Sequence, residues 1–292
     1  VQIAVVIALL PAIVALLLAP EWLPPVLIVT VFGEALATGT VTLSRVGGPL
    51  ALLVMIVALP SRKRVRLPHL GVLLAVIAYS AWAFASVQWT LNPDLSLQMG
   101  TTGYALSSLA LSLVYMLAMI MFVRTKQDVL RIMWTAWALA TITGLISIAQ
   151  YLSGFTRSYG LSGDANFFAA LQVVVLPMGA LLAIETRNTR TRVLVLIGVA
   201  ITVGSIMTSL SRGGILALVT VFVLLSLQPA RGFFRTAARK RAFLIFVAVG
   251  AGILLAVSYS ALSAKTSSLF AQGGGDGGSG RANLWRAAIT GW

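Results

Sequence analysis

The amino-acid sequence predicts an all-α protein, a polytopic membrane bundle of about ten transmembrane helices that ends in an extracytoplasmic loop. Of its 292 residues, 59% are hydrophobic and only 10% are charged, which is too few charges to cover a water-facing surface. Long apolar runs recur along the chain and lack the polar–apolar alternation of membrane β-barrel strands. Cysteine is absent, which also excludes a disulfide or cysteine-metal scaffold.

The apolar runs define the expected helices in chain order. A helix that crosses a bilayer needs about 20 mainly apolar residues. The candidates are residues 1–18, 26–43, 47–59, 70–87, 104–123, 129–152, 166–185, 193–208, 213–227 and 242–259. The third run is short, and it can borrow residues 43–46 if the Arg45 side chain snorkels to the interface. We therefore expect a transmembrane bundle over residues 1–259 and the start of an extracytoplasmic loop over residues 260–292.

The basic residues predict how the chain is threaded. Most of the 21 Lys and Arg residues lie in four connecting segments, which are residues 61–66, 124–131, 187–192 and 231–241. Two predicted helices separate each segment from the next, so all four fall on one side, which the positive-inside rule assigns to the cytoplasm. The net charge of +14 is thus a topology signal, aided by anionic lipid, and nucleic-acid binding is not expected. This threading puts residue 1 outside, which favours a missing upstream helix, and we expect the chain to continue beyond Trp292.

Few polar residues remain for chemistry. The only histidine, His69, adjoins a basic segment on the cytoplasmic side, so no Ser-His-Asp site is expected on the outer face. The aspartates of the outer face, Asp94, Asp164 and Asp276, are too far apart in sequence to indicate a metal site, and no cofactor is expected. Glu34 lies in the middle of a predicted span, where an ionisable side chain is either functional or a structural ion pair or neutral carboxyl.

The outer-face arginines give the strongest functional signal, because the positive-inside rule disfavours them there. Arg212 lies in the turn SLSRGG of residues 209–214, between two predicted helices. A helix N-terminus carries free N–H groups and the positive end of a dipole, and arginine binds phosphate oxygens in a bidentate manner. Ser211, Arg212 and Gly213 therefore indicate a phosphate-binding turn. The alternative is an arginine that only anchors the helix at the interface.

A second outer-face cluster is RSYGLSGDAN, residues 157–166, which joins two predicted helices. Asp164 is suited to cap the following helix, and Asn166 then falls in its first turn. Arg157 would bring a second positive charge toward the same crevice. The alternative is that this segment serves only to cap the helix.

A third cluster is SGRANLWR, residues 279–286, with Arg281, Trp285 and Arg286. It has the pattern of an amphipathic helix that lies on the membrane, and tryptophan suits the interface. Taken alone, this pattern is typical of an ordinary interfacial helix.

In this order, the three clusters resemble motifs of the O-antigen ligase and O-antigen polymerase superfamily. The family pattern begins with an Arg, a Gly and an Asn-containing turn that opens a helix, matched by Arg157, Gly160 and Asn166. A Ser-Arg-Gly turn follows two helices later, matched at residues 211–213, and then Gly-Arg-x-x-x-Trp, matched at residues 280–285. The resemblance covers roughly residues 150–292.

The chain departs from the family pattern at two points. Many members have Pro where this chain has Ala165, and the periplasmic-loop histidine proposed as a base in ligases has no counterpart up to Trp292. The resemblance therefore does not separate a ligase from a polymerase.

The resemblance implies a metal-independent glycosyltransferase in the bacterial cytoplasmic (inner) membrane, with its active site on the extracytoplasmic face. The donor would be a glycan linked to a polyprenyl diphosphate such as undecaprenyl diphosphate, and the acceptor a glycan, a lipid or a protein. Without a metal, arginines and a helix N-terminus remain to stabilise the diphosphate leaving group. Arg212 and Arg281 would take that role. The substrate-binding residues would be Arg157, Ser211, Gly213, Asp164, Asn166, Trp285 and Arg286.

Two other functions compete with this interpretation. A transporter or flippase of an anionic or lipid-linked substrate would place polar residues such as Glu34 at mid-membrane. A scaffold subunit of an envelope-assembly complex would need no arginine site at all.

Overall fold

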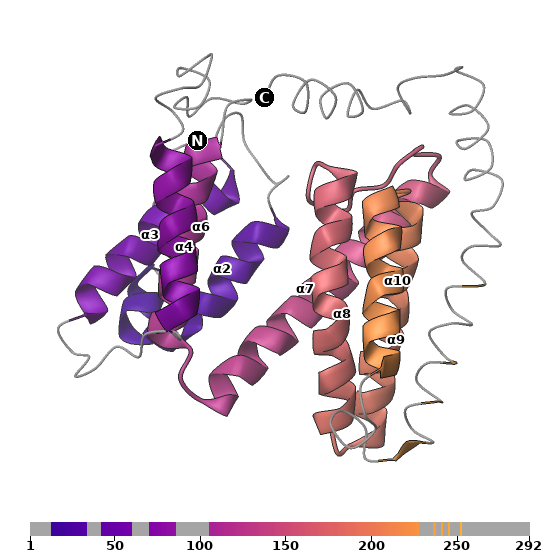
Figure 1. The fold of residues 1–292 in the computed structure, drawn as a ribbon. Helices are drawn as coiled ribbons and strands as arrows, with labels where there is room; N and C mark the ends of the chain where they lie inside the picture. The colour runs from indigo at the N-terminus through magenta and orange to yellow at the C-terminus, as the bar shows by residue number, and fades with distance from the viewer. Residues whose placement is uncertain are drawn as a thin grey trace, which may run out of the picture.

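The computed structural model describes residues 13–33, 42–59, 70–85 and 105–227, with five single positions between 236 and 252. Every regular element in this part of the chain is a helix (Figure 1), so the all-α prediction is confirmed there. The elements are the 3₁₀ turn η1 (Pro20–Trp22) and the helices α2 (Leu23–Phe32), α3 (Leu43–Ala58), α4 (Leu70–Ala85), α6 (Ala105–Phe122), α7 (Lys126–Leu152), α8 (Ala165–Glu185), α9 (Thr189–Thr208) and α10 (Arg212–Leu227).

Three of these helices, α7, α8 and α9, are long and apolar enough to cross a membrane. The outer surface of the helices is apolar as well: Trp82, Val174, Leu194 and Leu216 are all more than half exposed. Such a surface suits lipid and not water. Within the described residues the membrane prediction is confirmed to this extent. The predicted spans 1–18 and 242–259 lie largely outside the described residues.

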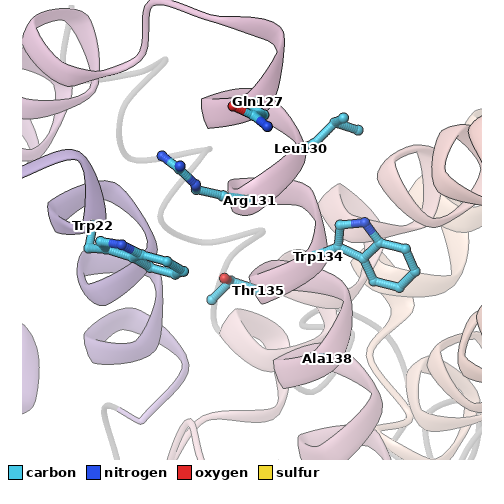
Figure 2. Close-up of a pocket in the computed structure, with 7 residues that line it drawn as sticks. All are labelled: Trp22, Gln127, Leu130, Arg131, Trp134, Thr135 and Ala138. Atoms are coloured by element: carbon cyan, nitrogen blue, oxygen red, sulfur yellow. The ribbon is translucent and has the colours of Figure 1, made fainter.

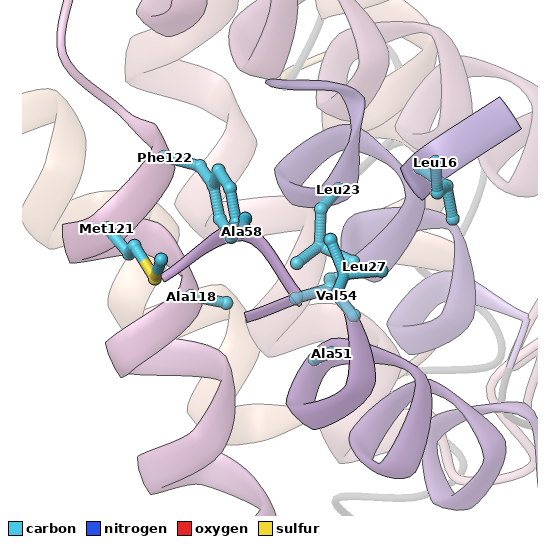
Figure 3. Packing of buried hydrophobic residues seen from close by; sticks show 9 residues of the cluster. All are labelled: Leu16, Leu23, Leu27, Ala51, Val54, Ala58, Ala118, Met121 and Phe122. Atoms are coloured by element: carbon cyan, nitrogen blue, oxygen red, sulfur yellow. The ribbon is translucent and has the colours of Figure 1, made fainter. Parts of the chain in front are cut away.

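The first helices form a packed group of their own. Side chains of α2, α3 and α6 meet in one apolar cluster (Figure 3), whose buried members include Leu27, Val54 and Phe122. The Tyr115 hydroxyl reinforces the contact, since it lies 2.7 Å from the Thr30 Oγ1 and donates to the backbone carbonyl of Ser44 at 3.0 Å.

The helices α7 to α10 form the second group, and α2 lies against α7. Within it α9 packs on both α7 and α8, and α10 packs on α8 and α9. Small residues let these helices approach closely, as in other membrane bundles. A Cβ at Gly198 would lie 2.5 Å from the Trp137 Nε1, and one at Gly179 would lie 2.7 Å from the Val199 Cγ2.

Capping residues explain where the helices begin. Thr125 and Asp128 form a reciprocal capping box, so α7 begins at Lys126 and not at the predicted residue 129. The Asn188 side chain accepts a 2.9 Å bond from the Arg190 N–H, so α9 begins four residues before the predicted start. The helix α3 begins at Leu43, which the prediction had assigned to the preceding helix, and α2 ends at Phe32.

The bundle of α7 to α10 has two chemically different ends. An ion pair between Lys126 and Glu185 joins the start of α7 to the end of α8. We call this the basic end, and it carries Arg124, Lys126, Arg131, Arg187, Arg190 and Arg192. The other end, which we call the polar end, consists of residues 153–164 between α7 and α8 and residues 209–211 between α9 and α10 (Figure 1).

Candidate functional site

The start of α8 at the polar end is capped as the sequence predicts. The Asp164 Oδ1 accepts hydrogen bonds from the backbone N–H groups of Asn166 and Phe167, at 2.9 and 2.7 Å. These bonds satisfy two of the free N–H groups that every helix N-terminus leaves. Asn166 consequently sits in the first turn of α8, with an exposed side chain.

The start of α10 is capped by Ser211. Its Oγ accepts a 3.2 Å bond from the backbone N–H of Gly214. No partner within the described residues takes the backbone N–H groups of Arg212 and Gly213. Arg212 and Gly213 are both exposed. A short segment with two free N–H groups and a guanidinium is a favourable place for an anion.

The turn from α9 to α10 is tight and held on both sides. Leu210 is buried and adopts φ +49°, a left-handed conformation that costs free energy for a residue with a side chain. The Ser209 Oγ donates to the Ile206 carbonyl at 2.7 Å and accepts from the Ser211 N–H at 3.2 Å. These bonds fix the point at which α10 begins, and with it the place of Arg212.

The two capped helix starts are joined through a single amide oxygen. The Asn166 Oδ1 accepts one bond from the Arg157 Nη2 at 3.0 Å and another from the Ser211 Oγ at 2.9 Å. The Arg157 Nε also lies 3.5 Å from the Ser209 carbonyl oxygen. Arg157, Asn166 and Ser211, three of the residues singled out in the sequence, thus form one connected group.

The loop that carries Arg157 is anchored to α7 by Gln150. The Gln150 Oε1 accepts from the backbone N–H groups of Tyr159 and Gly160, both at 3.0 Å, and its Nε2 donates to the Gly160 carbonyl at 3.0 Å. Gly160 has φ +55°, and a Cβ there would lie 2.7 Å from the Phe168 Cε2 and 2.9 Å from the Thr143 carbonyl oxygen. Only glycine fits this position without a shift of its neighbours.

Beneath the loop lies a buried cluster of hydroxyl groups. The Ser147 Oγ is 2.7 Å from the Ser158 Oγ and 3.2 Å from the Thr208 Oγ1, and the Ser158 Oγ donates to Thr208 at 3.0 Å. All three side chains are buried. Because buried polar groups are costly unless they are paired, this cluster ties the loop, α7 and α9 together.

The charges of this site favour an anion. Arg212 is exposed and Arg157 is half-buried, and the nearby Asp164 carboxylate is already bonded to two backbone N–H groups. Two guanidinium groups beside a helix N-terminus can hold phosphate oxygens. No group of three His, Cys, Asp or Glu residues that could hold a metal ion occurs in the described part of the chain.

The structure separates the roles of the two glycines in the predicted turn. A Cβ at Gly214 would lie 2.5 Å from the Ala169 Cβ, so Gly214 allows α10 to pack closely on α8. A Cβ at Gly213 would meet nothing within 4 Å, so the space beside this exposed residue is open.

Several residues named in the sequence are not placed. Arg281, Trp285 and Arg286 lie outside the described residues, as do Glu34 and His69. Gln150 and Ser147, in contrast, take part in the site, although the sequence did not single them out as candidate residues. The available signal was a pair of polar residues three positions apart near the end of an otherwise apolar helix.

Comparisons with models of protein families, with curated proteins and with solved structures find no match to this chain.

Proposed function

We propose that the protein is an integral-membrane glycosyltransferase of the O-antigen ligase or polymerase type. It transfers a glycan from a polyprenyl-diphosphate-linked donor to a glycan, lipid or protein acceptor at the extracytoplasmic face of the bacterial inner membrane. The observation that carries the proposal is the convergence of Arg157 and Ser211 on the Asn166 amide oxygen, directly beside Arg212.

The polar end has the features that a diphosphate group requires. The free backbone N–H groups of Arg212 and Gly213 and the exposed Arg212 guanidinium offer several donors in one place. Arg157 adds a second guanidinium whose orientation is set by Asn166. Both arginines lie at the polar end of the bundle. Because the positive-inside rule assigns the basic end to the cytoplasm, it assigns the polar end to the outer leaflet.

In the proposed reaction an acceptor hydroxyl oxygen attacks the anomeric carbon of the donor sugar. The new carbon–oxygen bond forms as the bond from that carbon to the diphosphate breaks, and the polyprenyl diphosphate leaves with the electron pair. Negative charge then grows on the diphosphate, and donors that are already in place stabilise it more in the transition state than in the ground state. Arg212 supplies this stabilisation, with Arg281 as a second contributor.

The acceptor needs a group that receives its hydroxyl proton or orients its oxygen. The Asp164 Oδ1 is occupied by two N–H groups, whereas its Oδ2 has no bond to another described residue. We assign Asp164 the task of orienting the acceptor hydroxyl, with the proton leaving to a base or to solvent.

One observation favours a transporter as the second candidate. The Gln172 side chain of α8 is fully buried, and its Oε1 has no hydrogen-bond partner among the described residues. Polar groups of this kind occur along substrate pathways of membrane transporters. The arginines and the free helix N-terminus lie at the end of the bundle instead, which favours chemistry at the membrane surface.

A reconstituted assay separates the two candidates. The full chain is placed in liposomes with an undecaprenyl-diphosphate-linked oligosaccharide as the donor. The acceptor is either a second molecule of this lipid-linked oligosaccharide or a lipid-linked core sugar. The enzyme yields a longer glycan and free undecaprenyl diphosphate without any ion gradient. Movement of the intact donor across the bilayer with no new glycosidic bond would contradict the proposal and support the transporter.

A further inference from the structure

A groove lies between the end of η1, directly before α2, and the first half of α7, at the basic end and away from Arg157 and Arg212. Its volume is about 570 Å³. Trp22 forms one side, and a stripe of α7 that runs from Gln127 through Arg131 and Trp134 to Ala138 forms the other. Trp22 and Arg131 point toward one another across this space (Figure 2).

The length of the groove matches one leaflet of a bilayer. The stripe from Gln127 to Ala138 extends about 16 Å along α7 at 1.5 Å per residue. Half of the hydrocarbon core is about 15 Å thick. α7 is one of the helices long and apolar enough to span the membrane, and the groove occupies only its first half, on the side of the basic end.

The groove is chemically divided in the same way as a phospholipid. Its deeper part is lined by Trp134, Thr135 and Ala138, with Thr135 on the side of Trp22 and the Trp134 ring turned away from it (Figure 2), while Arg131 stands nearer the end of the helix. The Arg131 Nη1 donates to the Asp128 Oδ1 at 3.0 Å, and its Cζ lies 5.3 Å from the centre of the Trp22 ring. Its remaining nitrogens have no hydrogen bond to another described residue, so they are available to a phosphate.

The acidic groups near the groove are largely engaged. The Asp128 Oδ2 accepts from the backbone N–H groups of Arg124 and Thr125 and from the Thr125 hydroxyl, at 3.1, 2.9 and 2.8 Å. Glu185 is paired with Lys126. Glu21, next to Trp22, is the third acidic residue beside the six basic residues that define this end. The excess of positive charge attracts anionic headgroups.

We propose that this groove is a binding site for an anionic phospholipid of the leaflet at the basic end. Arg131 binds the phosphate of the headgroup, Trp22 stacks against the guanidinium and the glycerol region, and one acyl chain lies along α7 past Thr135 and Ala138. The site is remote from the polar end and does not depend on glycan transfer.

The site predicts a specific loss of lipid binding in one variant. The full chain, delipidated in detergent, is titrated with phosphatidylglycerol or phosphatidylcholine, and bound lipid is counted by native mass spectrometry. The wild type binds phosphatidylglycerol more tightly, and Arg131→Gln weakens this binding about fivefold, as expected for one basic residue. Trp22→Leu weakens it as well. Arg190→Gln removes the same charge at the same end, outside the groove, and leaves binding within about twofold.

Three outcomes would overturn the site. They are equal binding of the two lipids, an equal loss in Arg131→Gln and Arg190→Gln, and displacement of the lipid by inorganic phosphate alone. Thermal unfolding with and without lipid distinguishes the loss of the binding site from a general loss of stability in the variant. Phosphatidylglycerol raises the unfolding temperature of the wild type and of Arg190→Gln, and this rise disappears in Arg131→Gln. A rise that persists in Arg131→Gln would contradict the site even if that variant unfolds at a lower temperature throughout.

Discussion

The Ser211 hydroxyl donates a 2.9 Å hydrogen bond to the Asn166 amide oxygen, across 45 residues of sequence. The same oxygen accepts from Arg157, and Ser211 in turn caps the helix that begins at Arg212. The Asn166 side chain therefore links Arg157 to Ser211, the residue directly before Arg212. If the diphosphate of a donor lies between Arg157 and Arg212, its binding depends on this connection.

The connection predicts different effects for two substitutions at Asn166. In Asn166→Ala both bonds are lost, the two arginines are no longer held together, and transfer falls by about 10²-fold, the cost of a 1 Å misplacement. In Asn166→Asp both donors keep an acceptor, but the added negative charge opposes the diphosphate, so KM for the donor rises more than kcat falls. Steady-state kinetics of transfer measure both. Wild-type kinetics in Asn166→Ala would show that the connection has no part in the reaction.

Removal of the Arg212 guanidinium is expected to abolish most of the transfer. Arg212→Ala loses one donor to the growing negative charge, which costs about 10²–10³ in rate at comparable sites. Arg212→Lys keeps the charge without the bidentate geometry and recovers only part of the activity. Arg190→Ala serves as the control, since Arg190 is an exposed arginine at the opposite end. Membrane insertion is checked by fractionation, and normal transfer by an inserted Arg212→Ala protein would rule out the proposed role.

The neighbouring glycines of this turn are expected to respond in opposite ways. In Gly214→Ala the new Cβ would lie 2.5 Å from the Ala169 Cβ, so α10 is pushed from α8 and the free energy of unfolding falls by about 1–3 kcal/mol. In Gly213→Ala the Cβ meets no protein atom, and stability is kept or rises by up to about 1 kcal/mol through helix propensity. Transfer by Gly213→Ala is nevertheless expected to fall if the donor binds at this exposed turn as proposed, because the methyl group takes up space beside the N–H groups of Arg212 and Gly213. Unfolding in mixed detergent micelles and the transfer assay test the two variants. Equal losses of stability in Gly213→Ala and Gly214→Ala would contradict the prediction.

Local signals account for what the sequence predicts well. Asp164 caps α8 as predicted, and α10 starts within one residue of the predicted position, because capping depends on residues that are adjacent in the chain. The alternation of basic segments also anticipated that Asn166 and Ser211 lie at the same end of the bundle. It did not predict that the Asn166 amide oxygen would accept from both Arg157 and Ser211, since that depends on how α8, α9 and α10 pack.

The sequence does not predict how the apolar helices are rotated about their axes. Where nearly every residue of a helix is hydrophobic, periodicity does not show which face meets a neighbour. The groove between Trp22 and Arg131 and the anchor at Gln150 therefore emerge only from the packed helices. The membrane environment itself, in contrast, follows from composition and needs no packing information.

Gln150 provides a test of how the Arg157 loop is positioned. Gln150→Leu leaves the backbone N–H groups of Tyr159 and Gly160 without their acceptor, which is expected to lower the free energy of unfolding by about 2 kcal/mol. Gln150→Glu keeps the acceptor and loses only the donor to the Gly160 carbonyl, so its loss is smaller. Because the loop carries Arg157, Gln150→Leu is also expected to raise KM for the donor. The rise in KM is smaller in Gln150→Glu. Unfolding in mixed micelles and donor titrations measure the two effects. Equal losses of stability and equal KM values in the two variants would show that the bonds from Gln150 do not position the loop.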